Sequence, residues 1–134
     1  MKFTSIRIIT DDIKRLVEFY ARVTRLEPSW FGEDFAEIAA ASCTLAIGST
    51  RTLKMFEAGD TRAGANRSAI IEFLVDDVDV EYERLKPLLK DVVQEPKTLP
   101  WGNRSLLFRD PDGALVNLFT PVSADAKRKF GLQM

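Results

Sequence analysis

The sequence contains no histidine and only one cysteine, Cys43. Without histidine, the Ser–His and Cys–His pairs of nucleophilic catalysis are absent, and a zinc site lacks its usual nitrogen ligand. A single cysteine excludes an intrachain disulfide framework, so we expect a protein of the reducing cytoplasm. Cys43 lies in a small apolar run, which predicts a buried structural thiol rather than a nucleophile.

Long apolar runs and runs of one charge are also missing. No stretch approaches the roughly 20 apolar residues of a membrane span, and Met1 and Lys2 lead into a predicted strand without a signal-peptide pattern. The 19 basic and 20 acidic residues give a net charge of −1 without a basic stripe, so we expect no nucleic-acid partner. Glycine-rich phosphate loops are absent as well. The 134 residues, 46% of them hydrophobic, suffice for one domain with a core.

The last third of the chain has the pattern of a β-hairpin. Two apolar runs, 105–108 and 114–119, flank Asp110-Pro111-Asp112-Gly113, in which proline and glycine favour a turn. Strand alternation divides the side chains of the two runs between two faces. In the first run, Leu106 and Phe108 share one face and Leu107 points to the other. In the second run, Val116, Leu118 and Thr120 form one row, and Asn117 and Phe119 form the opposite one.

A strand, an Asp-Asp pair and a helix occur twice in the chain. The first copy has a predicted strand at 3–10, Asp11-Asp12 as a cap, and a helix from Ile13 that ends before Pro28. The second copy, 65 residues later (75 minus 10), has a strand at 68–75, Asp76-Asp77, and a helix at 78–89 that Pro87 ends or kinks. The doubling predicts two similar, pseudo-symmetric modules.

The rest of the chain sets the predicted boundaries. A short strand is predicted at Leu53–Phe56, followed by a small, polar, glycine-containing linker. We therefore expect a single domain in four parts. These are module one at about 1–57, the linker at 58–67, module two at about 68–122, and a tail at 123–134.

The residues Phe108-Arg109-Asp110-Pro111-Asp112-Gly113, followed by Val-Asn-Leu-Phe, resemble a known pattern. The closing hairpin of the glyoxalase / bleomycin-resistance / extradiol-dioxygenase superfamily, also called vicinal oxygen chelate proteins, often has the sequence FxDPDGNxxELxE. This resemblance, together with the doubled unit, implies an α+β fold. It implies two βαβββ modules with curved mixed sheets that enclose a cavity.

The same resemblance implies where a metal ion would be held. Metal-dependent members place ligands at the start of each module's first strand and at the end of its last strand. The corresponding positions here are Ser5, Ile70, Thr120 and Gly48. None of these is a good ligand for a divalent ion. We therefore expect no metal and no other cofactor.

Strand parity selects two charged residues for the predicted cavity. Arg7 and Glu72 occupy equivalent positions in the two first strands, on the side away from the helices. Opposite charges aimed at one concavity are costly unless they pair with each other or with a ligand. The alternative is a pair of edge charges in water. Both alternatives remain open at this stage.

Aromatic residues and one further arginine complete the predicted site. We expect Trp30, Phe35, Trp101 and Arg104 near the mouth of the cavity, because ligand pockets combine aromatic walls with few polar anchors. Phe31 and Phe56 are further candidates, and core packing is the alternative for each ring.

Three functions are consistent with these residues. The first is metal-independent binding of a small, aromatic or antibiotic-like molecule by a homodimer. The second is a metal-free lyase or isomerase with Glu72 as general base. The third is a non-catalytic regulatory or accessory domain. The absence of histidine and of metal ligands favours binding over catalysis.

Overall fold

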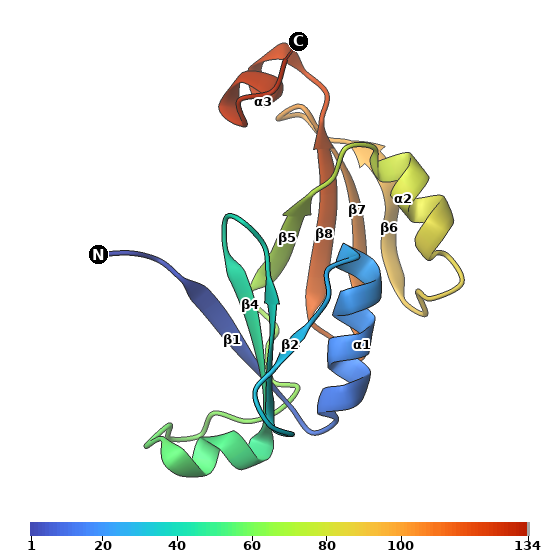
Figure 1. Cartoon of the computed structure of the whole chain (residues 1–134). Helices are drawn as coiled ribbons and strands as arrows, with labels where there is room; N and C mark the ends of the chain where they lie inside the picture. Colours follow the sequence, from blue (N-terminus) through green and yellow to red (C-terminus); the bar gives the residue numbers. More distant parts are fainter. Residues whose placement is uncertain (134) are drawn as a thin grey trace. The chain divides into compact units, whose positions relative to one another are not determined.

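The computed structural model describes residues 1–133, which fold as two compact units. The first unit comprises Met1–Asn66 together with Pro111–Gly113, and the second comprises Arg67–Asp110 and the chain from Ala114 onward. Figure 1 shows the course of the chain through both. Each unit is described by itself below.

The first unit contains a four-stranded mixed sheet. Its elements are β1 (Ser5–Thr10), α1 (Ile13–Thr24), β2 (Ser29–Trp30), β3 (Phe35–Ala39), β4 (Thr44–Ser49) and the 3₁₀-helix η1 (Thr50–Met55). The strand order is β1-β4-β3-β2, with β1 parallel to β4 and the other pairs antiparallel.

The second unit repeats this topology. Its elements are β5 (Ile70–Leu74), α2 (Val78–Leu85), β6 (Val92–Thr98), β7 (Asn103–Arg109), β8 (Leu115–Pro121) and α3 (Ala124–Lys129). The order is β5-β8-β7-β6, and β5 is parallel to β8. The predicted α+β class with two βαβββ modules is therefore confirmed.

The second aspartate of each Asp-Asp pair caps its helix. Asp12 accepts a hydrogen bond from the backbone N–H of Arg15 (3.2 Å). Asp77 accepts from the N–H groups of Asp79 (3.0 Å) and Val80 (3.3 Å). These carboxylates satisfy donors that the first turn of a helix leaves without a partner. The shared sequence pair thus has the same physical role in both units.

Each helix covers one face of the sheet in its own unit. Leu16, Val17 and Tyr20 of α1 are buried, as are Ala36, Ile38 and Ile47 of the sheet beneath them. Val78 and Leu85 of α2 are buried together with Leu106, Phe108, Val116 and Leu118. Alternation then directs the intervening residues to the face away from the helix. In the 105–119 hairpin, the register places Leu106 and Phe108 opposite Leu118 and Val116 on the α2 side, while Phe119 of the other row is also buried.

Two local expectations were wrong. Leu53–Phe56 is not a strand, because Thr52 donates its hydroxyl to the carbonyl of Ser49 (2.7 Å) and the chain coils into η1. Cys43 is exposed rather than buried, since it lies in the turn between β3 and β4. The tail contains the short helix α3, capped by Ser123. No helix among residues 1–133 has the length and apolar character needed to cross a membrane.

Candidate functional site

The face of the first sheet away from α1 carries a cation among aromatic rings. Arg7 of β1 is exposed, and its guanidinium carbon lies 4.6 Å from the ring centroid of Phe35 and 5.2 Å from that of Phe56. The Phe31 ring lies 5.9 Å from that of Phe35. Cations are attracted to ring faces at these distances. We name Arg7, Phe31, Phe35 and Phe56 the Arg7 cluster.

Strand register explains why Arg7 meets Phe35. Arg7 lies beside Ala46 in β4, while Phe35 lies beside Gly48, two residues further along the same strand. A Cβ atom at Gly48 would lie 3.8 Å from Cδ of Arg7, so the arginine stem passes next to this glycine. The small residues at 46 and 48 leave room for the long side chain to lie across the sheet toward Phe35.

Phe56 reaches the cluster through η1. The 3₁₀-helix starts immediately after β4, and the N–H of Phe56 donates to the carbonyl of Leu53 (3.1 Å) at its end. A Cβ atom at Gly48 would lie only 2.9 Å from Oγ1 of Thr52, which is buried within η1. Gly48 therefore permits the close approach of η1 to β4 that brings Phe56 to Arg7.

In the second unit, Glu72 has a hydrogen-bonded neighbour. Asn117 of β8, its register partner, donates from Nδ2 to Oε2 of Glu72 (2.8 Å). The Oδ1 atom of Asn117 is buried and has no hydrogen-bond partner among the described residues. Asn117 was not among the site residues predicted from the sequence. Its place opposite the row of Val116 and Leu118 was the feature that could have identified it.

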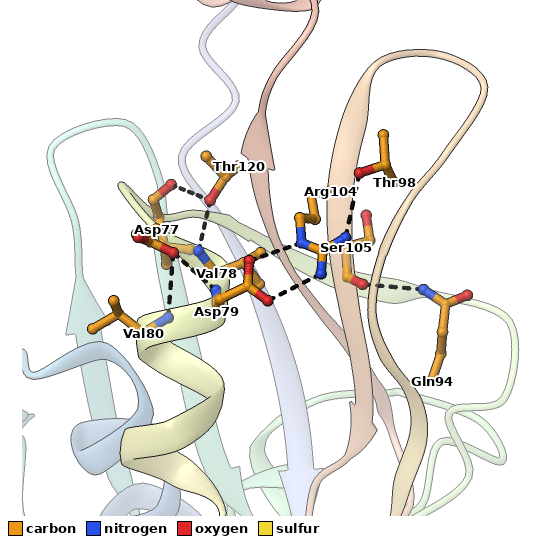
Figure 2. A network of polar contacts seen from close by, with 10 residues as sticks. Asp77, Val78, Asp79, Val80, Gln94, Thr98, Arg104, Ser105 and Thr120 are labelled. Carbon is orange, nitrogen blue, oxygen red and sulfur yellow. Dashed lines mark hydrogen bonds and ion pairs between the residues drawn. The ribbon is translucent and has the colours of Figure 1, made fainter.

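Arg104 and Thr120 lie on the α2 side of the second sheet (Figure 2). Arg104 donates from Nε (2.8 Å) and Nη2 (3.1 Å) to the carboxylate of Asp79. Thr120 accepts from the N–H of Val78 and donates to the carbonyl of Val75, both at 2.9 Å. Neither residue shares a face with Glu72. The ligand role of Arg104 stays a prediction, and we leave this residue out of the proposed site.

The two tryptophans are both exposed, and neither belongs to the Arg7 cluster. Trp30 of β2 is 41% exposed and borders an open pocket of about 550 Å³ in the first unit. The pocket has a mixed charged lining that includes Asp11, Lys14, Glu33 and Arg51. Trp101 is 66% exposed in the turn between β6 and β7. Of the six predicted ligand residues, the structure brings Arg7 and Phe35 together, while the shared cavity with Glu72 stays a prediction.

No group of three or more His, Cys, Asp or Glu side chains able to hold a metal ion occurs within residues 1–133. Of the positions implied for a metal, Ser5 and Ile70 begin β1 and β5, and Gly48 lies near the end of β4. Thr120 faces α2 and bonds with backbone groups, so it does not share a face with Ile70.

The Asp79–Arg104 pair makes stability depend on pH. The hydrogen bonds from Arg104 lower the pKa of Asp79 below its ordinary value. A carboxyl group whose pKa is lower in the folded state stabilises the fold above its unfolded pKa, near 4, and that contribution is lost as the pH falls through the folded pKa. We expect Asp79→Asn to narrow the difference between the urea midpoints at pH 7 and pH 3. The effect should be small, because the Asp79 side chain is 56% exposed. Asp125→Asn, which removes an exposed carboxylate on α3, is the control; an equal narrowing in both variants would contradict the prediction.

Comparison with known proteins gives one family. The sequence model described as the Glyoxalase/Bleomycin resistance protein/Dioxygenase superfamily matches residues 2–118. The uncharacterized protein YraH of Bacillus subtilis (strain 168) is 29% identical over 127 residues, which cover 89% of this chain and 98% of YraH.

Solved structures show the same fold. A glyoxalase/bleomycin resistance protein/dioxygenase family enzyme from Burkholderia phytofirmans PsJN superposes with a TM-score of 0.82 at 12% identity, covering 91% of this chain and all of that one. A glyoxalase/bleomycin resistance protein/dioxygenase from Nocardioides has a TM-score of 0.76 at 21% identity, covering 92% and 85%. Lactoylglutathione lyase from Agrobacterium tumefaciens has a TM-score of 0.68 at 22% identity, covering 89% and 92%. At these identities the likeness concerns the fold alone.

Proposed function

The chain belongs to the glyoxalase/bleomycin resistance protein/dioxygenase superfamily, and we propose that it binds a small aromatic molecule without a metal ion. This family places unrelated chemistries on one scaffold, so the function depends on the side chains that this chain presents. The proposal rests on the first unit, where the sheet face away from α1 carries the Arg7 cluster.

The observation that carries the proposal is the exposure of the rings in that cluster. Phe31 is 58% exposed and Phe56 is 53% exposed, beside an exposed arginine. Burial of a large aromatic side chain stabilises the folded protein. A group of rings that stay exposed next to one polar anchor is therefore typical of a binding surface. The flat surface of these rings suits an aromatic ligand.

Metal independence is supported by the residue types. The sequence has no histidine, and the residues at the implied ligand positions include an isoleucine and a glycine. The hydroxyl of Thr120 is already used by the backbone of Val75 and Val78. A divalent ion would need three or four side-chain ligands at fixed geometry. Binding through ring faces and one guanidinium requires none of these.

Binding should be measured on the full chain with 2-naphthoate, an aromatic probe, by isothermal titration calorimetry. We expect saturable binding that EDTA leaves unchanged. Phe56→Ala should weaken it by about three- to tenfold, because one ring contact is lost. Phe3→Ala, which removes a 74% exposed ring outside the cluster, is the matched control. Loss of binding in EDTA that added metal restores would contradict the proposal.

A second candidate function follows from the Glu72–Asn117 pair. The amide of Asn117 orients the exposed carboxylate of Glu72, which a general base would require. A metal-free lyase or isomerase would convert its ligand, and Glu72→Gln would abolish product formation while leaving binding in place. If the wild-type protein and Glu72→Gln both bind the ligand and neither converts it, the result favours metal-independent binding over catalysis. The homodimer stays a prediction, to be checked by sedimentation.

A further inference from the structure

We propose that Arg7 is the specificity-determining residue of this site and that its ligand carries an anionic group beside its aromatic ring. The inference rests on the proposed function and names the class of molecule that the site takes. It follows from the contacts that Arg7 makes and from those that it lacks within its own unit.

The charge of Arg7 is not neutralised by a carboxylate of the first unit. Arg51 forms an ion pair with Asp34 (2.6 Å), and Arg15 lies 3.8 Å from a carboxylate oxygen of Asp12. In contrast, no carboxylate among the described residues of this unit forms an ion pair with Arg7. An exposed charge in this position is available to a ligand of opposite sign.

The aromatic rings contact the guanidinium of Arg7 but accept no hydrogen bonds from its N–H donors. Phenyl faces attract a cation electrostatically and offer no strong acceptor to its N–H groups. The guanidinium carries five N–H donors in a planar arrangement that matches the two oxygens of a carboxylate or phosphate. Phe35 and Phe56 therefore restrict the position of Arg7 without consuming the donors that would recognise an anion.

The backbone beneath Arg7 supports the same geometry. The arginine stem passes next to Gly48, and Ala46 beside it has only a methyl group. Because the guanidinium lies against the rings of Phe35 and Phe56, binding an anion costs less side-chain entropy than it would at an arginine without such contacts. An anion on the guanidinium would place an attached ring against Phe31 or Phe56, both of which are more than half exposed.

The test compares three probes that share a naphthalene ring. These are 2-naphthoate, 2-naphthyl phosphate and the neutral 2-naphthalenemethanol, each titrated into the full-length protein. We expect at least one of the anions to bind about tenfold or more tightly than the alcohol, since the charge-assisted hydrogen bonds are available only to the anions. The tighter of the two anions identifies the ligand group as carboxylate or phosphate.

Variants at position 7 assign this preference to the arginine. Arg7→Met should reduce the preference for the anion to less than about twofold while leaving the affinity for the alcohol nearly unchanged. Arg7→Lys keeps the charge but not the planar donors, and should retain part of the preference. Arg51→Met removes an equal charge from the same unit outside the cluster, and should leave the preference intact. Circular dichroism of each variant confirms the fold, which an exposed side chain is not expected to alter.

The possible failures are distinguishable. Equal affinity of the wild-type protein for anion and alcohol would overturn the inference and leave the proposed function standing. A preference that survives in Arg7→Met, or that Arg51→Met removes equally, would also overturn it. Absence of binding of all three probes to the wild-type protein would overturn the proposed function, and the inference with it.

Discussion

Replacement of Phe108 by alanine should lower the free energy of unfolding by about 3–5 kcal/mol. Phe108 is fully buried in β7, with Val116 of β8 and Val92 of β6 as its register partners. It lies on the α2 side of the sheet, in the same row as Leu106. Truncation removes most of a large side chain from this layer, and the neighbouring strands cannot close the cavity because their backbones are held by ladder hydrogen bonds.

Urea unfolding followed by far-ultraviolet circular dichroism measures this loss. Phe31→Ala is the matched control, because it removes the same ring from a position that is 58% exposed. We expect that variant to stay within about 1 kcal/mol of the wild-type protein. If the two variants lost equal stability, Phe108 would not be the core residue that its burial indicates.

Replacement of Gly102 by alanine should cost about 2–5 kcal/mol, from a strained backbone and a direct overlap. The φ angle of Gly102 is +92°, which alanine rarely adopts. An added Cβ atom would overlap Oγ of Ser123 and would lie 2.7 Å from its Cβ atom. Ser123 caps α3 through the N–H of Ala126 (3.0 Å), and the Gly102 carbonyl accepts from Val122 and Ser123. The substitution should therefore also detach α3.

Gly131→Ala separates the effect of backbone strain from the effect of overlap with a neighbouring side chain. Gly131 has a φ of +69°, but an added Cβ would meet no atom within 4 Å. This variant carries the backbone strain without the overlap, so its loss should be smaller. The measurements are urea unfolding and the amide exchange of α3 followed by nuclear magnetic resonance. Equal losses in the two variants would show that contact with Ser123 is unimportant.

Local sequence patterns predicted those features that depend on interactions between residues close together in the chain, namely the helix starts and the closing turn. The two Asp-Asp pairs predicted the helix starts, and Asp12 and Asp77 do accept the expected backbone hydrogen bonds. Proline and glycine predicted the turn at 110–113, where Gly113 has a φ of +91°. Alternation predicted which residues of the final hairpin share a face, because successive side chains of a strand point to opposite sides; burial did not follow the rows alone, since Ser105 and Phe119 of the opposite row are buried too.

The same alternation could have placed Arg104 correctly. It belongs to the row of Leu106 and Phe108, which faces α2, whereas it was expected near the cavity mouth because it lies just ahead of the strand that leads into the closing turn. The side chain pairs with Asp79, 25 residues away, and this partner depends on how α2 lies on the sheet. Asn117 was overlooked for a similar reason, since only the β5–β8 register sets it beside Glu72.

In the candidate site, too, some features follow from the sequence and others only from the tertiary structure. The sequence by itself determined the helix caps, the closing turn and the face on which Arg7 lies, because these depend on residues within a few positions of each other. The two-module α+β fold could be predicted as well, because the strand, Asp-Asp pair and helix occur twice and the final hairpin has the family's pattern. Only the tertiary structure decided that Arg7 meets Phe35 and Phe56. That contact requires the β1–β4–β3 register, the missing side chain at Gly48 and the coiling of η1, which bring together residues up to 49 positions apart (56 minus 7). Such contacts depend on the packing of whole elements, which no short stretch of the chain specifies.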